Sequence, residues 1–198
     1  MARSLFGTLR SSNMPKSSTQ TQSAVLGGGC FWCLEAVYQE VTGVENVVSG
    51  YAGGTVPNPT YYQIETATTG HAQVVELTFQ PSVISYRDIL DIFWVVHNPT
   101  TLNRQDYDQG PQYRSIILYQ GEDQKKIATE SKDAASALWS NPIMTEIVPL
   151  DTFYEAEPEH QNYFRSHPER AYCQIIINPK LQKLRAKFQA RLKAQPSP

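Results

Sequence analysis

The chain has 198 residues, of which 40% are hydrophobic and 18% charged, and its formal net charge at pH 7 is −2. This length supports one domain with a hydrophobic core and is short for two well-packed ones. The nearly balanced charge gives no basic field for nucleic acid, and no apolar run approaches the roughly 18 residues of a membrane span. We therefore expect a soluble, single-domain protein that binds neither nucleic acid nor membrane.

The cysteine content and the N-terminal composition bear on the cellular compartment. Three cysteines do not form the framework of a secreted protein, and they favour a reducing compartment such as the cytoplasm. Residues 1–22 are rich in Ser and Thr and contain three basic and no acidic residues. This composition partly resembles an organellar transit peptide, so organellar targeting stays open beside the simpler prediction of a disordered extension. We expect one domain over residues 23–193 and a tail over residues 194–198.

The first predicted elements are a strand, a glycine turn and a helix. Residues 25–26 end a buried strand, residues 27–29 are three glycines, and from Cys30 onward apolar residues recur at helical spacing. Residues 45–51, ENVVSGY, predict a second strand. Residues 53–60, GGTVPNPT, predict a long loop, and such loops tend to carry function.

The middle of the chain predicts a strand followed by a helix. In residues 71–79, HAQVVELTF, alternate apolar side chains mark one strand face, and Gln73 lies in phase with them. Ser85 and Asp88 form a plausible N-cap pair. The helix that they open has its apolar side chains along one stripe and ends at His97.

The last part of the chain again mixes both kinds of element. Strands are predicted over residues 115–119, 145–148 and 174–177, and helices over residues 123–139 and 181–192. Strands and helices are thus interleaved along the whole chain, as in a protein of mixed α and β class.

Cys30 and Cys33, in the sequence GGGCFWC, are the strongest chemical signal. A cysteine in the first turn of a helix meets unpaired backbone N–H groups and the positive end of the helix dipole, which both stabilise the thiolate. Side chains at positions i and i+3 are neighbours, so the pair is placed to form a disulfide. These features favour a redox or metal role. Phe31 and Trp32 between the cysteines are suited to an apolar pocket for a methyl or thioether group.

Two other roles are open to this cysteine pair, a zinc site and a general dithiol exchange. Zinc requires four ligands, and the remaining candidates are Cys173 and four scattered histidines without ligand spacing. We therefore predict no bound metal and expect structural, hydrogen-bonded histidines. A general dithiol oxidoreductase of the thioredoxin type usually has Trp immediately before its first cysteine, whereas in this chain the aromatics lie between the cysteines. That alternative predicts reduction of insulin disulfides.

Eight segments together carry a family resemblance. They are GCFWC at 29–33, GYAGG at 50–54, NPTY at 58–61, TGHAQ at 69–73, HNPTT at 97–101, DQGPQYRS at 108–115, FYEAEPEHQNYF at 153–164 and AYC at 171–173. In this order they resemble the A-class peptide methionine sulfoxide reductases, over roughly residues 24–190. The resemblance implies an α+β fold, a two-layer sandwich of the ferredoxin-like type with a mixed sheet flanked by helices. It also implies that the active-site cysteine lies at a helix N-terminus.

The activity implied by the resemblance is reduction of the S epimer of methionine sulfoxide, free or in proteins, to methionine. Cys30 would attack the sulfoxide sulfur and end as a sulfenic acid. Cys33 or Cys173 would then condense with it to form a disulfide, and the order of these two resolving thiols stays open. Thioredoxin, or dithiothreitol in the test tube, would restore the enzyme. We expect no bound cofactor and a monomer.

The resemblance also assigns roles to other residues. Tyr61 and Tyr113 match phenols that hydrogen-bond the sulfoxide oxygen and stabilise its developing charge. Phe31 and Trp32 match the pocket for the methyl group. Asp108 matches an acid that helps to hold the polar side of the site.

One position departs from the family pattern. The family ordinarily reads GHAE, and its glutamate is held protonated so that it can give its proton to the sulfoxide oxygen. In this chain the residue is Gln73, whose amide donates a hydrogen bond but cannot deliver a proton. Losing a general acid typically lowers a rate on the order of a hundredfold to ten-thousandfold. Either a tyrosine or water completes the transfer, or this is a low-turnover variant that acts as a redox sensor or binds oxidised methionine.

Overall fold

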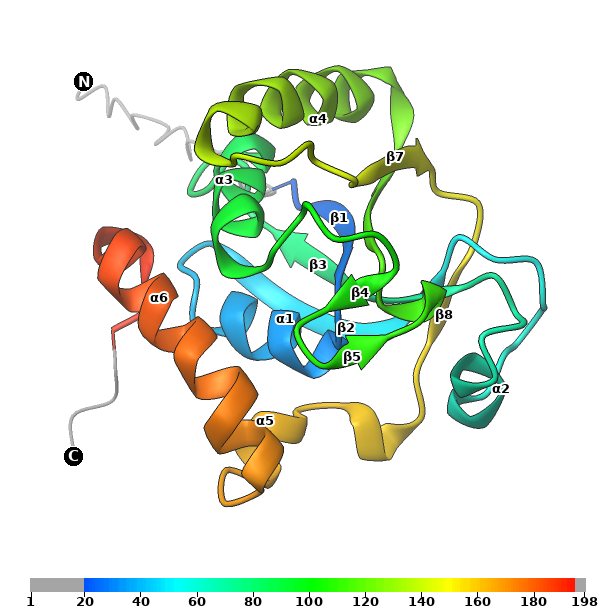
Figure 1. Ribbon diagram of the computed structural model, residues 1–198. Helices are drawn as coiled ribbons and strands as arrows, with labels where there is room; N and C mark the ends of the chain where they lie inside the picture. Colours follow the sequence, from blue (N-terminus) through cyan, green and yellow to red (C-terminus); the bar gives the residue numbers. More distant parts are fainter. Residues whose placement is uncertain (1–19, 195–198) are drawn as a thin grey trace, which may run out of the picture.

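Figure 1 shows the computed structural model, which describes residues 20–194. The predicted extension over residues 1–22 lies outside these residues except for its last three, and the first strand already begins at Gln22. Of the predicted tail, only residue 194 is described. Between residues 20 and 194, no helix has the length and apolar character needed to cross a membrane.

A six-stranded sheet in the order β7-β6-β1-β3-β2-β8 forms the centre of the molecule. Neighbouring strands are antiparallel except β6 and β7, which are parallel. The strands are β1 (Gln22–Gly28), β2 (Val44–Ala52), β3 (Ala72–Phe79), β6 (Ser115–Tyr119), β7 (Glu146–Pro149) and β8 (Phe153–Glu155). Two short strands, β4 (Arg104–Gln105) and β5 (Asp108–Gln109), pair separately as a hairpin.

Six α-helices and several short helical turns accompany the sheet in the described part of the chain. The helices are α1 (Phe31–Gln39), α2 (Tyr61–Glu65), α3 (Tyr86–Val96), α4 (Gly121–Ala135), α5 (Tyr163–Ser166) and α6 (Asn178–Phe188). The 3-10 turns are η1 (Pro111–Tyr113), η2 (Ser136–Leu138), η3 (Pro158–His160) and η5 (Gln189–Arg191), and η4 (Cys173–Ile177) is π-helical.

The predicted α+β class and ferredoxin-like arrangement are confirmed. The four central strands follow the order β6-β1-β3-β2, with α1 between β1 and β2 and α3 between β3 and β6. This is the βαββαβ order of a split βαβ sheet. One face of the sheet packs against helices in a large core, whereas a smaller apolar cluster lies on the other face.

The alternation along β3 decides where Gln73 points. Val75, Leu77 and Phe79 belong to the large core on the helix side, whereas Val74 belongs to the smaller cluster on the opposite face. Successive side chains of a strand point to opposite faces, so Gln73 shares the helix side. The predicted phase of Gln73 is therefore confirmed, and it directs the amide toward the beginning of α1.

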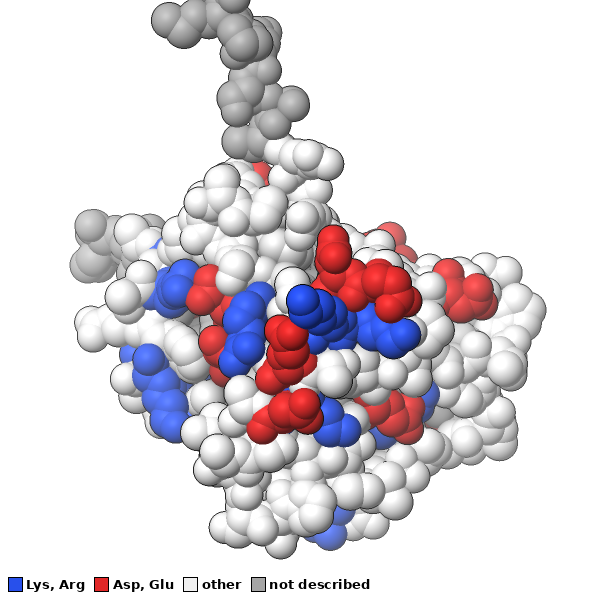
Figure 2. All heavy atoms as spheres, turned by 90° about the horizontal axis from the view of Figure 1, so that it is seen from above, with Lys and Arg blue, Asp and Glu red and all other residues white. Residues whose placement is uncertain are grey.

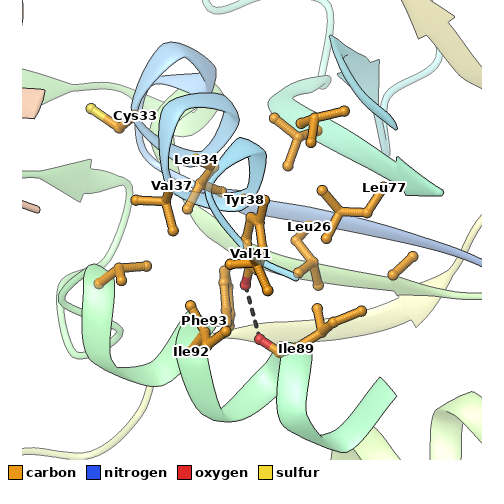
Figure 3. Packing of buried hydrophobic residues seen from close by; sticks show 14 of the residues in the cluster. Leu26, Cys33, Leu34, Val37, Tyr38, Val41, Leu77, Ile89, Ile92 and Phe93 are labelled. Carbon is orange, nitrogen blue, oxygen red and sulfur yellow. Dashed lines mark hydrogen bonds between the residues drawn. The ribbon is translucent and has the colours of Figure 1, made fainter. Parts of the chain in front are cut away.

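Helices α1 and α3 pack against each other over this face (Figure 3). Leu34 and Val37 of α1, and Val41 just beyond its end, lie close to Ile89 and Phe93 of α3 in the same buried cluster. The hydroxyl of Tyr38 donates a hydrogen bond of 2.9 Å to the carbonyl of Ile89, so its burial leaves no polar atom unpaired. This packing fixes α1, and with it the position of Cys30.

The predicted start and end of α3 are confirmed. The Ser85 hydroxyl accepts from the backbone N–H of Asp88, and the Asp88 carboxylate accepts from the backbone N–H of Ser85, which completes a capping box. His97 is the C-cap residue. The side chains of two amino acids thus satisfy backbone donors that a helix end otherwise leaves open.

Residues 174–177, predicted as a strand, are instead π-helical and lead directly into α6. The isoleucine run suggested a strand. Yet Cys173 and Ile177 are buried while Ile175 is 65% exposed, and this spacing of four continues to Leu181 and fits a helix. The strand prediction was wrong because burial on one helical face outweighed β-propensity.

Smaller differences concern element boundaries. Residues 27–28 continue β1 and do not form the predicted turn, which is left to Gly29 alone. The helix predicted over residues 123–139 begins at Gly121 and ends at Ala135, followed by η2. The last predicted helix ends at Phe188, before η5. The strands β4, β5 and β8 were not predicted.

Acidic and basic side chains are intermingled on the face that Figure 2 shows. On α4, Glu122 and Asp123 occupy the first turn and Lys132 the last, and Lys125 lies 3.4 Å from Glu122. This distribution agrees with the helix dipole and gives no field of a single sign.

Candidate active site

Cys30 is the N-cap residue of α1, and Gly29 makes the turn that places it there. Gly29 has φ +98°, a conformation that disfavours any side chain, and a Cβ at this position would lie 2.7 Å from the Cβ of Gln105. Gly28 is pressed against the ring of His97, where a Cβ would approach within 3.0 Å. The glycines therefore allow close approach at the end of β1, and the chain turns from strand to helix within two residues, Gly29 and Cys30.

Cys30 and Cys33 are free, nearly buried thiols that interact with each other. Burial, followed by the hydrogen bond with Cys33, raises the pKa of Cys30 well above its usual value. The hydrogen bond from Cys30 lowers the pKa of Cys33. Burial of Cys30 thus opposes the thiolate that a helix N-terminus favours.

Tyr172 covers the thiol pair from the C-terminal segment. Its hydroxyl lies 3.9 Å from the sulfur of Cys33 and donates a hydrogen bond of 2.8 Å to Asp108 on β5. Burial raises the pKa of Asp108. Asp108 is therefore linked to the thiol pair through Tyr172, a residue that was not predicted from the sequence.

Aromatic rings line the other side of Cys30. Phe31 lies 6.0 Å from Trp32 and 6.4 Å from Tyr61, measured between ring centroids. Trp32 stacks on Tyr163 with centroids 3.7 Å apart, and Tyr61 stacks on His160 at 4.2 Å. These rings form one continuous aromatic wall that includes Phe31 and Trp32.

Gln73 lies next to the beginning of α1 and is almost fully buried, with 1% of its surface exposed. Its Oε1 accepts a hydrogen bond of 3.2 Å from the backbone N–H of Phe31. Its Nε2 donates one of 3.2 Å to Glu65 Oε1. Because Gln73 takes a donor of the first helical turn, that donor is not available to a thiolate at Cys30.

Glu65 is the last residue of α2 and joins the polar groups of the site. The hydroxyl of Tyr113 lies 3.1 Å from each of its two carboxylate oxygens. Glu65 was not predicted from the sequence to be a site residue. The only signal that could have found it is its place four residues after Tyr61, one helical turn along α2.

Side chains that contact the backbone hold the loops that carry these groups. His71 Nδ1 accepts from the backbone N–H of Gly54 at 3.0 Å, and its Nε2 lies 2.8 Å from the carbonyl oxygen of Val56. Arg114 donates to the carbonyls of Pro111 at 2.9 Å and Gly70 at 3.1 Å. His71 is thus a hydrogen-bonded structural group, and Arg114 fixes the turn that presents Tyr113.

Cys173 lies at the beginning of η4, directly after Tyr172, and its side chain is fully buried. Burial raises its pKa, and the nearby Cys33 adds to this shift. Over residues 20–194, no three His, Cys, Asp or Glu side chains are grouped so that they could share a metal ion. The structure thus gathers Cys30, Cys33 and Cys173 at one end of α1.

Two free thiols within the first turn of a helix are an arrangement typical of thiol-dependent oxidoreductases. A model of the family described as peptide methionine sulfoxide reductase matches residues 22–192. The chain belongs to the peptide methionine sulfoxide reductase family and is an enzyme of that class. It is 50% identical over 182 residues to "Peptide methionine sulfoxide reductase MsrA" of Polynucleobacter asymbioticus, covering 91% of this chain and 96% of that one. It is 55% identical over 170 residues to the MsrA of Paenarthrobacter aurescens, covering 86% and 98%.

Solved structures agree with this assignment. The reduced form of Mxr1 from Saccharomyces cerevisiae has a TM-score of 0.72 and 30% identity, covering 84% of this chain and 96% of that one. Mxr1 has also been solved in complex with Trx2, a structure with a TM-score of 0.51 and 24% identity that covers 77% and 91%. The relatives therefore share the fold over most of both chains.

Proposed function

We propose that the protein reduces methionine-S-sulfoxide, free or within oxidised proteins, to methionine, with Cys30 as the nucleophile. The observation that carries this proposal is that Cys30, a free thiol that interacts with Cys33, directly precedes Phe31 and Trp32, whose rings pack with Tyr61. A methyl sulfoxide has an apolar methyl group and a polar oxygen. A site with aromatic carbon beside phenol hydroxyls matches both ends.

The first step transfers two electrons from Cys30 to the sulfoxide sulfur. Cys33 accepts the proton of the Cys30 thiol, to which it is already hydrogen-bonded, and the Cys30 sulfur attacks the substrate sulfur. The sulfur–oxygen bond of the substrate breaks as its oxygen takes up a proton. In sum, a thiolate, a sulfoxide and one proton give a sulfenic acid on Cys30 and methionine.

Tyr61 and Tyr113 donate hydrogen bonds to the sulfoxide oxygen as its negative charge grows. Burial raises the pKa of both phenols, so both keep their protons throughout the working pH range. Phe31 and Trp32 receive the methyl group. Asp108 holds Tyr172 over the thiols and so keeps the polar side of the site in place.

The sulfenic acid is then resolved by a second thiol with loss of water. Cys33 is adjacent to Cys30, whereas Cys173 follows Tyr172, which contacts Cys33. We propose a relay in which Cys33 or Cys173 first forms the disulfide and thioredoxin reduces the exposed pair. The complex of Mxr1 with Trx2 supports this choice of reductant, and dithiothreitol replaces it in the test tube.

The test is an assay driven by dithiothreitol on the separate S and R epimers of methionine sulfoxide. The wild type is expected to reduce the S epimer and Cys30→Ser to be inactive. Activity that survives in Cys30→Ser would overturn the mechanism. Mapping the disulfide after one equivalent of substrate in Cys33→Ser and Cys173→Ser would give the resolving order.

A second candidate function rests on Gln73, which cannot supply a proton. In this form the protein binds oxidised methionine, reacts once, and reports its oxidation to a partner as a redox sensor. A stoichiometric burst without further turnover in excess dithiothreitol would support this function. Continuous turnover at a rate typical of enzymes, on the order of 1 per second or more, would exclude it.

A further inference from the structure

The hydrogen bonds around Gln73 fix the orientation of its amide. The backbone N–H of Phe31 can only donate, so the atom that faces it at 3.2 Å must be the amide oxygen. The NH₂ group is therefore directed to Glu65, whose Oε1 lies 3.2 Å away. Gln73 links the beginning of α1 to a carboxyl group that lies eight residues earlier in the sequence.

Glu65 reaches the phenol side of the site as well as Gln73. Both of its oxygens lie 3.1 Å from the hydroxyl of Tyr113, one of the two phenols proposed to hold the sulfoxide oxygen. The side chain of Glu65 is exposed to solvent, whereas Gln73 is buried. The carboxyl group of Glu65 thus contacts Tyr113 in the site, and the same side chain is exposed to solvent.

We propose that Glu65 is the proton source of the reduction and takes the role that Gln73 cannot fill. The protonated Glu65 gives its proton to the Tyr113 oxygen while the Tyr113 hydroxyl proton passes to the sulfoxide oxygen. Tyr113 ends neutral, Glu65 ends as a carboxylate, and the sulfur–oxygen bond breaks as Cys30 takes up the oxidation. Glu65 acts through Tyr113 and is therefore a positioning and relay residue.

The protonation state of Glu65 decides what Tyr113 offers to the substrate. When Glu65 is a carboxylate, it accepts a hydrogen bond from the Tyr113 hydroxyl. The hydroxyl proton is then not available to the sulfoxide. When Glu65 is protonated, it donates to the Tyr113 oxygen and frees that proton. Because Glu65 is exposed, solvent restores its proton between turnovers.

Several titratable groups lie close enough to Glu65 to be influenced by its charge. Tyr61 of α2, Tyr113 of η1, Tyr51 of β2 and His160 of η3 each have a pKa that the charge of Glu65 influences. All three tyrosines keep their protons because burial raises their pKa values. Burial lowers the pKa of His160, which favours its neutral form. Glu65 is therefore the one carboxyl group in this set of neighbouring tyrosines and histidine.

The proposal assigns complementary roles to positions 65 and 73. In the family pattern the acid is at the position of Gln73, whereas in this chain position 73 holds the amide and α2 supplies the acid. Gln73→Glu alone would bring two carboxyl groups within the present 3.2 Å distance, where they compete for one proton. Glu65→Gln alone would leave two amides and no acid. The double variant Glu65→Gln/Gln73→Glu exchanges the two groups and restores one acid.

The experiment measures the first-turnover rate by rapid quench on methionine-S-sulfoxide over a range of pH. Glu65→Gln is expected to lower this rate on the order of a hundredfold with little change in KM. The matched control is Glu155→Gln, the same change at an exposed carboxylate on β8, which keeps the wild-type rate.

The exchange variant separates proton supply from structure. Glu65→Gln/Gln73→Glu is expected to react at least about tenfold faster than Glu65→Gln, because an acid again contacts the site. The proposal is overturned if Glu65→Gln keeps the wild-type rate and pH profile, or if its loss is not recovered by the exchange while urea unfolding is unchanged. A wild type without first turnover would instead contradict the proposed Cys30 chemistry, so the two failures are distinguishable.

Discussion

The hydroxyl of Tyr172 donates a hydrogen bond of 2.8 Å to Asp108 and lies 3.9 Å from the sulfur of Cys33. One side chain thereby joins the β4-β5 hairpin to the segment that carries Cys173. The hydrogen bond from Tyr172 lowers the pKa of Cys33, after the larger effect of the bond from Cys30. The reactivity of the thiols therefore depends on a residue in the last third of the chain.

Tyr172→Phe is expected to slow the reaction of the thiol pair with iodoacetamide at pH 7. Removing the hydroxyl removes a hydrogen bond that favours the thiolate, so the thiol pKa values rise and the thiolate fraction falls. A shift of one pKa unit corresponds to about a tenfold change in rate. The measurement is the alkylation rate as a function of pH, followed by mass spectrometry.

The matched control is Tyr163→Phe, which removes the hydroxyl of the ring that stacks on Trp32. Within the described residues, the Tyr163 hydroxyl makes no hydrogen bond to a thiol. Equal slowing in both variants would show that the aromatic wall, and not the Tyr172 hydroxyl, sets the reactivity.

Gly29→Ala is expected to destabilise the protein more than Gly121→Ala. Both glycines have positive φ, +98° and +82°, so each alanine meets the same kind of conformational penalty. A Cβ at Gly121 meets open space, whereas one at Gly29 meets Gln105, which is held by hydrogen bonds of 3.1 and 3.0 Å to the backbone of Asn98. The expected losses in urea unfolding are about 1 kcal/mol for Gly121→Ala and about 2–4 kcal/mol for Gly29→Ala. Similar losses would show that Gln105 moves aside.

Glu35→Gln is expected to destabilise the protein by about 1–3 kcal/mol. Glu35 is buried, and its two oxygens accept from the backbone N–H groups of Asn162 at 2.7 Å and Tyr163 at 3.2 Å. An amide would direct its NH₂ group at one of these donors and leave it unpaired. Glu40→Gln, which removes the charge of a more exposed pair with Arg185, should lower the free energy of unfolding by less than about 1 kcal/mol. Equal effects would contradict the role of burial.

Stability is expected to decrease as the pH falls below about 6.5, and His97 contributes to the decrease. Burial lowers the pKa of His97 to about 3, and this effect exceeds the opposite effect of the hydrogen bond between Nδ1 and the carbonyl of Phe93 at 2.6 Å. Its Nε2 lies 2.8 Å from the Ser115 hydroxyl. The unfolded chain binds the extra proton first, so this contribution is complete above pH 6.5 and is lost toward pH 3. The measurement is the free energy of urea unfolding between pH 4 and 7. A His97→Gln variant with the same slope would show that other groups cause it.

Much of the fold could be predicted because its signals are local. The alternation along β3 and the Ser85–Asp88 pair each depend on residues that are close in sequence, and both predictions are confirmed. The strand β8 has no such signal, because Phe153 fits against β2 where Gly50 has no side chain. The π-helical turn from Cys173 to Ile177 was missed because its isoleucines favour a strand until their burial is known.

The residues of the candidate site likewise fall into those that the sequence reveals and those that only the fold brings together. Cys30, Phe31 and Trp32 lie together because they share one helical turn, which the sequence reveals. Tyr172 and Glu65 contact the site from segments that enter it only in three dimensions. An exposed glutamate in a five-residue helix does not differ in sequence from a solvated one. The roles of the site residues remain predictions that the experiments above address.

The hydrogen bond between Gln73 and Glu65 affects how sequences of this family should be compared. An alignment scored column by column records a lost acid at position 73 and would class the chain as defective. The same chain holds a carboxyl group on the other side of that amide, 3.2 Å away. A homologue that lacks the expected acid should therefore be judged inactive only after its spatial neighbours have been searched for a replacement, since chemistry constrains where a proton donor lies and not its number in the chain.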